Sequence, residues 1–128
     1  MKSLIKYNLI QDNDNALDLM YKGIINIIND NVIKLSYTDE NKILNTIDIN
    51  NEDKEVVVKN TNELRFKVNK DYKAKYKTAY GVIDLKVVTK KLDIKLDKEQ
   101  SKLVLDMEYN LYQGPSPIIN KLNIEVTY

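Results

Sequence analysis

The regular alternation of residues 72 to 80 constrains the fold of this chain more than any other feature. Tyr72, Ala74, Tyr76, Thr78 and Tyr80 occupy the even positions, and Lys73, Lys75 and Lys77 lie between them. Successive side chains of a β-strand point to opposite faces, so this spacing predicts a strand with one face on a core and a basic face in water.

Shorter segments with the same period of two fill most of the chain, and helical spacing is almost absent. They cover residues 5–9, 17–27, 33–37, 43–49, 56–58, 64–68, 83–96, 103–111 and 118–128, separated by turns rich in Asn and Asp. Gly23 predicts a bulge or sharp bend inside its strand. The apolar phase changes from odd to even numbers near Lys90 and Lys91, which predicts a β-bulge there.

Short connections between consecutive strands favour antiparallel neighbours, and closure of the sheet removes its free edges. The sequence therefore predicts an all-β fold, a single antiparallel meander β-barrel of about 8–10 strands, with a β-sandwich as the alternative. No internal repeat or linker interrupts the pattern, so residues 1–128 are expected to form a single domain.

The composition removes several kinds of chemistry. The chain has no Cys and no His, which takes away disulfides, thiolate metal sites and the commonest general base. No glycine-rich phosphate loop is present, and the acidic pairs fall in turns. We therefore expect no enzymatic activity, no metal and no cofactor. The N-terminus lacks an apolar signal region and no run is long enough to span a membrane, so we expect a cytoplasmic protein without membrane association.

Residues 75–93, KYKTAYGVIDLKVVTKKLD, resemble the YwiB-like family of bacterial proteins. Thr78, Tyr80, Gly81 and Thr89 match the family pattern, whereas Ala79 stands where proline is commoner. The segments IKLSYTDE (33–40), DMEYNLYQ (106–113) and KLNIEVTY (121–128) also fit the family. The resemblance implies a calycin-like, lipocalin-related barrel and brings no assigned activity or catalytic residue.

One candidate binding site is a group of aromatic side chains on the inward face. These are Tyr37, Phe66, Tyr72, Tyr76, Tyr80 and Tyr109. An eight-stranded barrel is just wide enough to be filled by side chains or to hold one small ligand. The rings therefore form either a pocket for an apolar or amphipathic ligand or an ordinary core. Asn45, also on the inward face, must find a hydrogen-bond partner, as a structural contact or as part of a pocket.

The second candidate is the basic outward face formed by Lys73, Lys75 and Lys77, with Lys86 expected across the hairpin. Such a face could bind phosphates of RNA, other anions or an acidic partner, or it could simply keep the strand soluble. The net charge of only +1 makes nucleic acid the less favoured partner, and no aromatic residue is expected between these lysines.

These features favour a non-catalytic binding module for a small apolar or amphipathic ligand or a protein partner. The alternative is an anion- or RNA-binding module that uses the lysines. A third interpretation is an assembly protein that forms a homodimer through exposed apolar residues such as Met20, Ile24 and Ile28.

Overall fold

The computed structural model describes residues 1–128 and consists of ten β-strands joined by turns. The strands are β1 (Lys2–Gln11), β2 (Asp14–Ile27), β3 (Val32–Thr38), β4 (Leu44–Asn50), β5 (Glu55–Lys59), β6 (Glu63–Lys67), β7 (Tyr72–Thr78), β8 (Gly81–Asp97), β9 (Lys102–Tyr112) and β10 (Pro117–Thr127). All of the strand pairs are antiparallel. The all-β prediction is therefore confirmed. The chain contains no helix that is long and apolar enough to cross a membrane.

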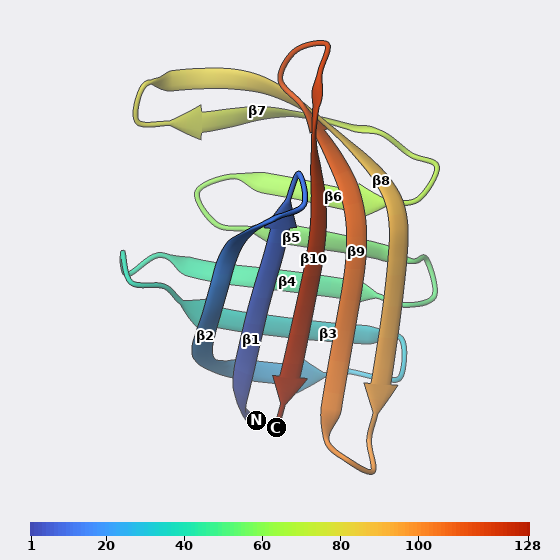
Figure 1. The fold of residues 1–128 in the computed structure, drawn as a ribbon. Coiled ribbons are helices and arrows are strands. Elements are labelled where there is room, and N and C mark those ends of the chain that lie inside the picture. Colours follow the sequence, from blue (N-terminus) through green and yellow to red (C-terminus); the bar gives the residue numbers. More distant parts are fainter.

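The ten strands form one sheet in the order β6-β5-β4-β3-β2-β1-β10-β9-β8-β7. Every neighbour in this order is also a neighbour in sequence, except that β1 pairs with β10 and so joins the two ends of the chain (Figure 1). The result is a nearly closed meander barrel whose gap lies between β6 and β7. The predicted barrel is confirmed, and its relationship to lipocalins stays a prediction.

Isolated contacts replace a strand ladder at the gap between β6 and β7. Val68 forms a parallel bridge with Thr89. The Lys77 N–H donates to the Asn62 side-chain oxygen at 2.7 Å, and the Asn62 amide donates to the Lys77 carbonyl at 3.0 Å. β7 pairs with β8 along one edge. On its other edge, which faces the gap, the Asn62 side chain takes the place of a strand.

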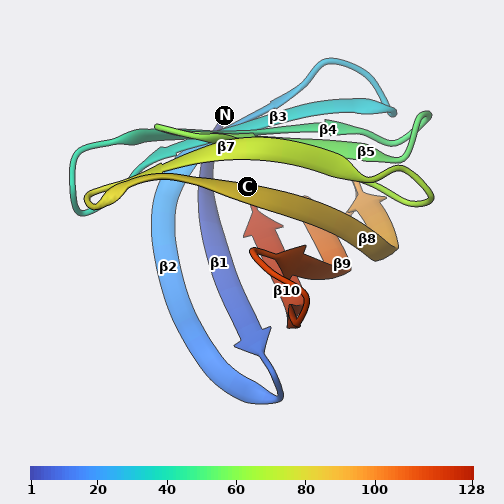
Figure 2. The same ribbon diagram turned by 90° about the horizontal axis from the view of Figure 1, so that it is seen from above.

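Two long strands, β2 and β8, bend and carry the sheet from one layer to the other (Figures 1 and 2). The strands β1, β9 and β10 cross in front of β3 to β6 at a steep angle. In β2, pairing with β1 extends to Ile24, whereas pairing with β3 begins at Gly23. In β8, the register with β9 shifts between Thr89 and Lys91, which confirms the predicted bulge. The bend expected at Gly23 is where the two layers meet.

Nineteen buried apolar side chains from both layers form a single core. Phe66 of β6 and Tyr109 of β9 meet across it edge to face, with ring centroids 4.7 Å apart. Aromatic pairs favour this arrangement because the ring edge is positive and the ring face negative. Most inward positions of the alternating pattern are therefore packed core.

The buried side chain of Asn45 lies at one end of this core and is fully engaged. Its amide donates to Asp39 at 3.0 Å and to the Ile43 carbonyl at 3.1 Å, and its oxygen accepts from Asn60 at 3.1 Å. Asn45 therefore has the hydrogen-bond partners that its burial requires. They connect β4 to the turn before it and to the turn between β5 and β6.

Candidate ligand-binding sites

Five inward-facing tyrosines approach one another on one side of the barrel, and we call this group the tyrosine mouth. Its members are Tyr7 of β1, Tyr21 of β2, Tyr37 of β3, Tyr76 of β7 and Tyr109 of β9. Alternation places each of them on the core side of its strand, beside buried neighbours such as Ile5 and Leu35. The rings of Tyr21 and Tyr37 stack with centroids 4.4 Å apart and planes inclined by 21°.

Burial and neighbouring tyrosines raise the pKa values of three of these phenols, those of Tyr7, Tyr37 and Tyr109. Burial raises the pKa of Tyr7 to about 12, with a further contribution from the charges that Tyr21 and Tyr76 would carry. The pKa values of Tyr37 and Tyr109 are also raised, in each case mainly by burial and then by neighbouring tyrosines. Neutral phenols can both donate and accept hydrogen bonds, so the tyrosine mouth presents a convergent set of polar groups.

Most of these hydroxyl groups have no partner within the protein. Tyr21 donates to Glu40 at 3.0 Å, whereas the hydroxyls of Tyr7, Tyr37, Tyr76 and Tyr109 form no hydrogen bond with another residue. Tyr109 is only 6% exposed, yet its oxygen is not among the fully enclosed, unpaired polar atoms of the chain, so it borders accessible space. Buried hydroxyls normally have a partner, and here that partner must come from outside the chain.

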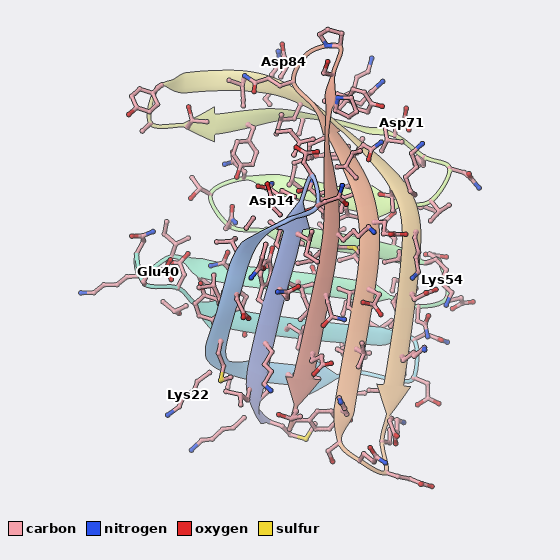
Figure 3. The ribbon with its side chains drawn as sticks, viewed as in Figure 1. Asp14, Lys22, Glu40, Lys54, Asp71 and Asp84 are labelled. Atoms are coloured by element: carbon pink, nitrogen blue, oxygen red, sulfur yellow. The ribbon has the colours of Figure 1, made fainter.

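A hollow of about 450 Å³ opens beside Tyr76 and is also lined by Asp39, Ile43 and Asn62. Glu40, which accepts the Tyr21 hydroxyl, lies in the turn between β3 and β4 on the left of Figure 3. Asp39 and Glu40 both contribute to the raised pKa of Tyr37. The rim of the tyrosine mouth is therefore acidic on this side.

The structure separates the six aromatic residues that the sequence grouped together. Tyr37, Tyr76 and Tyr109 belong to the tyrosine mouth. Phe66 is 2% exposed within the core, and the Tyr72 hydroxyl donates to Glu63 at 3.4 Å, apart from the others.

The expectation that Tyr80 faces inward is wrong, because its side chain is fully exposed. The strand β7 ends at Thr78, so alternation no longer governs the next residues. The Thr78 hydroxyl accepts from the Tyr80 N–H at 3.2 Å and donates to the Gly81 carbonyl at 2.8 Å. This turn, with Gly81 at a φ of 126°, directs Tyr80 into water.

Tyr7 and Tyr21 belong to the tyrosine mouth although they are not among the six aromatic residues predicted from the sequence. Each has the same phase as the apolar residues of its strand, which was a usable signal. The missing information was that β7, which lies far from β1 and β2 in sequence, brings Tyr76 close to Tyr7 and Tyr21.

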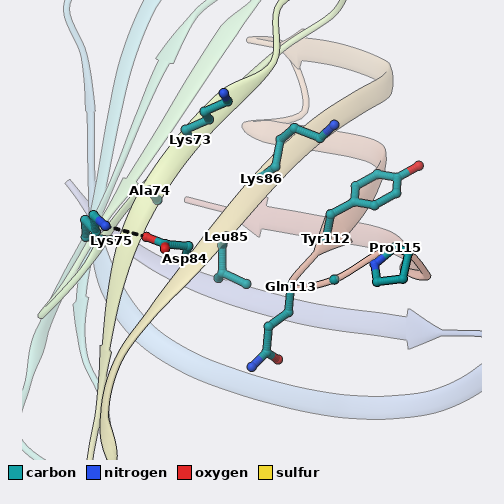
Figure 4. A pocket seen from close by; sticks show the side chains of 10 residues that line it. Lys73, Ala74, Lys75, Asp84, Leu85, Lys86, Tyr112, Gln113 and Pro115 are labelled. Atoms are coloured by element: carbon teal, nitrogen blue, oxygen red, sulfur yellow. Dashed lines mark ion pairs between the residues drawn. The ribbon is translucent and has the colours of Figure 1, made fainter.

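A second hollow, of about 700 Å³, lies where β7, β8 and the end of β9 meet the loop after β9. We call it the lysine groove; its charged and aromatic lining consists of Lys73, Lys75, Asp84, Lys86 and Tyr112 (Figure 4). The pairing register puts Lys73 directly opposite Lys86, and Lys86 opposite Tyr112. Three strands thus contribute one row of outward side chains.

The charges in the lysine groove are unevenly compensated. Lys75 forms an ion pair with Asp84 at 2.6 Å, whereas neither Lys73 nor Lys86 lies within ion-pair distance of a carboxylate. The Lys86 ammonium lies 4.8 Å from the centre of the Tyr112 ring. This face therefore carries an aromatic ring, contrary to the expectation from the sequence.

Lys77, the fourth lysine of the predicted anion-binding face, lies outside the lysine groove. It borders the hollow beside Tyr76, and Val82 is its partner on β8. The structure therefore brings together only three of the four lysines.

The apolar side chains of Met20, Ile24 and Ile28 are each at least half exposed on β2 and in the turn after it. Their exposure agrees with the surface that the sequence suggested for a homodimer. Dimerisation itself stays a prediction.

Comparison with known proteins identifies the family. A family described as a domain of unknown function, DUF1934, matches residues 4–125. The chain belongs to the DUF1934 family. No protein among the curated ones matches it.

The DUF1934 chain also resembles a solved structure, the crystal structure of the ywiB protein from Bacillus subtilis. The two share 22% sequence identity over 98% of this chain and 89% of the other, with a TM-score of 0.77. The resemblance to the YwiB-like family is thus confirmed, and at this identity the likeness establishes a shared fold.

Proposed function

We propose that this DUF1934 protein is a non-catalytic binding module that holds a small amphipathic ligand at the tyrosine mouth. The observation that carries the proposal is the hydroxyl of Tyr109, which lacks a protein partner although its residue is 6% exposed. Because its oxygen borders accessible space, a ligand or an ordered water can supply the missing hydrogen bond.

The surroundings of the tyrosine mouth suit a molecule with one apolar and one polar end. The ring faces of Tyr21 and Tyr37, with Ile43 in the adjoining hollow, offer apolar surface. The free hydroxyls of Tyr7 and Tyr37 offer both donors and acceptors. Aromatic walls with a few convergent polar groups are typical of small-molecule sites.

The acidic rim of the tyrosine mouth restricts the charge that the polar end of the ligand can carry. The carboxylates of Asp39 and Glu40 repel an anion that approaches Tyr37. Tyrosine ring faces attract cations. The polar end of the ligand is therefore neutral or positively charged.

A matched series of six-carbon probes tests the proposal: hexanol, hexylamine and hexanoate. Each is titrated into protein whose tyrosines carry ¹³C at Cζ, because this NMR signal reports on the hydroxyl. We expect hexanol or hexylamine to shift the signals of Tyr7, Tyr37 and Tyr109, with hexanoate the weakest of the three. The proposal fails if millimolar concentrations of all three leave these signals in place.

Two Tyr→Phe variants show whether the hydroxyls matter. Tyr109→Phe removes one unpaired hydroxyl and should weaken binding by roughly tenfold, the effect of one lost hydrogen bond. Tyr80→Phe is the matched control, since Tyr80 is fully exposed. Equal weakening by both variants would contradict a site at the tyrosine mouth. Native mass spectrometry of the gently purified protein then shows whether a natural ligand adds a mass that denaturation removes.

A further inference from the structure

The lysine groove lies on the outward face of β7 and β8, so it is separate from the tyrosine mouth within the barrel. Figure 4 shows Lys73, Lys86 and Tyr112 extending from the same side of their strands, whereas Leu85 and Gln113 extend from the other side. The loop after β9 closes one end of the groove with Pro115. A row of three outward side chains and a loop thus border an open groove of about 700 Å³.

The position of Lys73 relative to Lys86 is unfavourable in the free protein. Like charges directly opposite each other on neighbouring strands destabilise a sheet. The ammonium of the nearby Lys75 forms an ion pair with the Asp84 carboxylate at 2.6 Å, but neither Lys73 nor Lys86 forms an ion pair with a carboxylate. An anion bound between these two ammonium groups would offset their repulsion. The relief of this repulsion would stabilise the bound protein relative to the free protein.

The other residues that line the lysine groove indicate which chemical group of a ligand lies beside its anionic group. The Lys86 ammonium is held 4.8 Å from the centre of the Tyr112 ring, a cation–π contact that orients it. The ring of Tyr112 and the pyrrolidine of Pro115 add apolar surface beside the charges. Lysine ammonium groups act as point charges that suit phosphate oxygens.

We propose that the lysine groove binds a small organic phosphate. The phosphate lies between Lys73 and Lys86, and the organic part lies against Tyr112 and Pro115. Lys75 remains paired with Asp84 and contributes little net charge. Lys77, on the same strand and with the same outward phase, takes no part because it lies outside the groove.

Adenosine monophosphate and inorganic phosphate are suitable probes, followed by the amide signals of ¹⁵N-labelled protein in low salt. We expect adenosine monophosphate to shift the signals of Lys73, Lys86 and Tyr112, and to bind roughly tenfold more tightly than inorganic phosphate because of its organic part. Binding should weaken as salt is added, since the groove is open to water. The absence of shifts at millimolar nucleotide would overturn the proposal.

Single lysine substitutions locate the site. Lys73→Gln and Lys86→Gln should each weaken nucleotide binding by roughly tenfold, the loss of one charge-assisted contact. Lys77→Gln is the matched control and should bind as the parent does. If Lys77→Gln weakens binding as much as Lys73→Gln, the lysines act as a general basic surface and the groove is not the site.

A single-stranded RNA oligonucleotide distinguishes a small-molecule site from a nucleic-acid surface. Binding of the oligonucleotide no tighter than that of the mononucleotide supports the proposal. Much tighter binding, with a steep salt dependence and an effect of Lys77→Gln, would overturn it in favour of RNA, because several phosphates are then contacted at once.

Discussion

The side-chain amide of Asn62 forms two hydrogen bonds with the backbone of Lys77, at 2.7 and 3.0 Å. Asn62 lies just before β6, and Lys77 lies near the end of β7. These are the two strands at the gap in the barrel, and the pair of bonds reproduces the exchange between neighbouring strands. One polar side chain therefore protects an edge that the sheet leaves open.

Removal of this contact should destabilise the barrel. Asn62→Ala eliminates two hydrogen bonds, each with a net contribution of about 0.5–1.5 kcal/mol, so we expect a loss of about 1–3 kcal/mol in the free energy of unfolding. Urea denaturation measures the change. Asn41→Ala, in an exposed turn where the side chain forms no hydrogen bond, should change stability by less than about 0.5 kcal/mol. Similar losses for both variants would show that the Asn62 contact contributes nothing specific.

Gly23 should not tolerate a side chain. A Cβ atom at this position would collide with the backbone oxygen of Ser36 and would lie 2.8 Å from the Ile5 side chain. We expect Gly23→Ala to lower stability by about 1–3 kcal/mol or more, the usual cost of overpacking. Gly114→Ala is the control, because no atom lies within 4 Å of its added Cβ. An unchanged melting temperature for Gly23→Ala would mean that β2 and β3 can separate at no cost.

The Asn45 network should couple the core to the turn at Asp39. Asn45→Ala removes bonds to Asp39 and Asn60 and should cost about 1–3 kcal/mol, since buried polar groups lose their partners. The exposed Asn26→Ala should have little effect. The hydrogen bond from Asn45 is also the largest cause of the lowered pKa of the Asp39 carboxyl. An NMR titration of the Asn45→Ala variant should therefore show that pKa rising towards its usual value.

Alkaline pH should lower the stability of the protein through the buried phenols of the tyrosine mouth. Below pH 10 the Tyr7 phenol is protonated in both the folded and the unfolded chain, so it causes no pH dependence there. Between pH 10 and about 12 the unfolded chain loses this proton while the folded protein keeps it, because burial raises the pKa of Tyr7 to about 12. The free energy of unfolding should fall over this range by at most about 1.4 kcal/mol per pH unit for this residue.

Denaturation curves collected between pH 8 and 12 measure this slope. Tyr37 and Tyr109 add to it in the same direction, since their pKa values are also raised. Tyr7→Phe removes one of the titrating groups, so its stability should fall less steeply. Equal slopes for the parent and the variant would show that the Tyr7 phenol ionises alike in the folded and unfolded states.

The alternating pattern predicts the place of a side chain only as far as the strand itself extends. The phase change at Lys90 and Lys91 located the bulge of β8 because one strand must change face there. The same reasoning failed at Tyr80, since β7 had already ended at Thr78. For Tyr112, the outward phase was readable, but its place beside Lys86 required the register between β8 and β9.

The sequence by itself determined the all-β class, the approximate strand limits and which side chains face the core, because alternation is a property of each strand alone. Only the tertiary structure decided that β1 pairs with β10, that β6 and β7 leave a gap, and that Tyr7, Tyr37 and Tyr109 approach one another. It also decided that Lys73 and Lys86 share a groove from which Lys77 is absent. Such contacts join residues far apart in the chain, so they depend on strand order, register and bending, which no local period encodes.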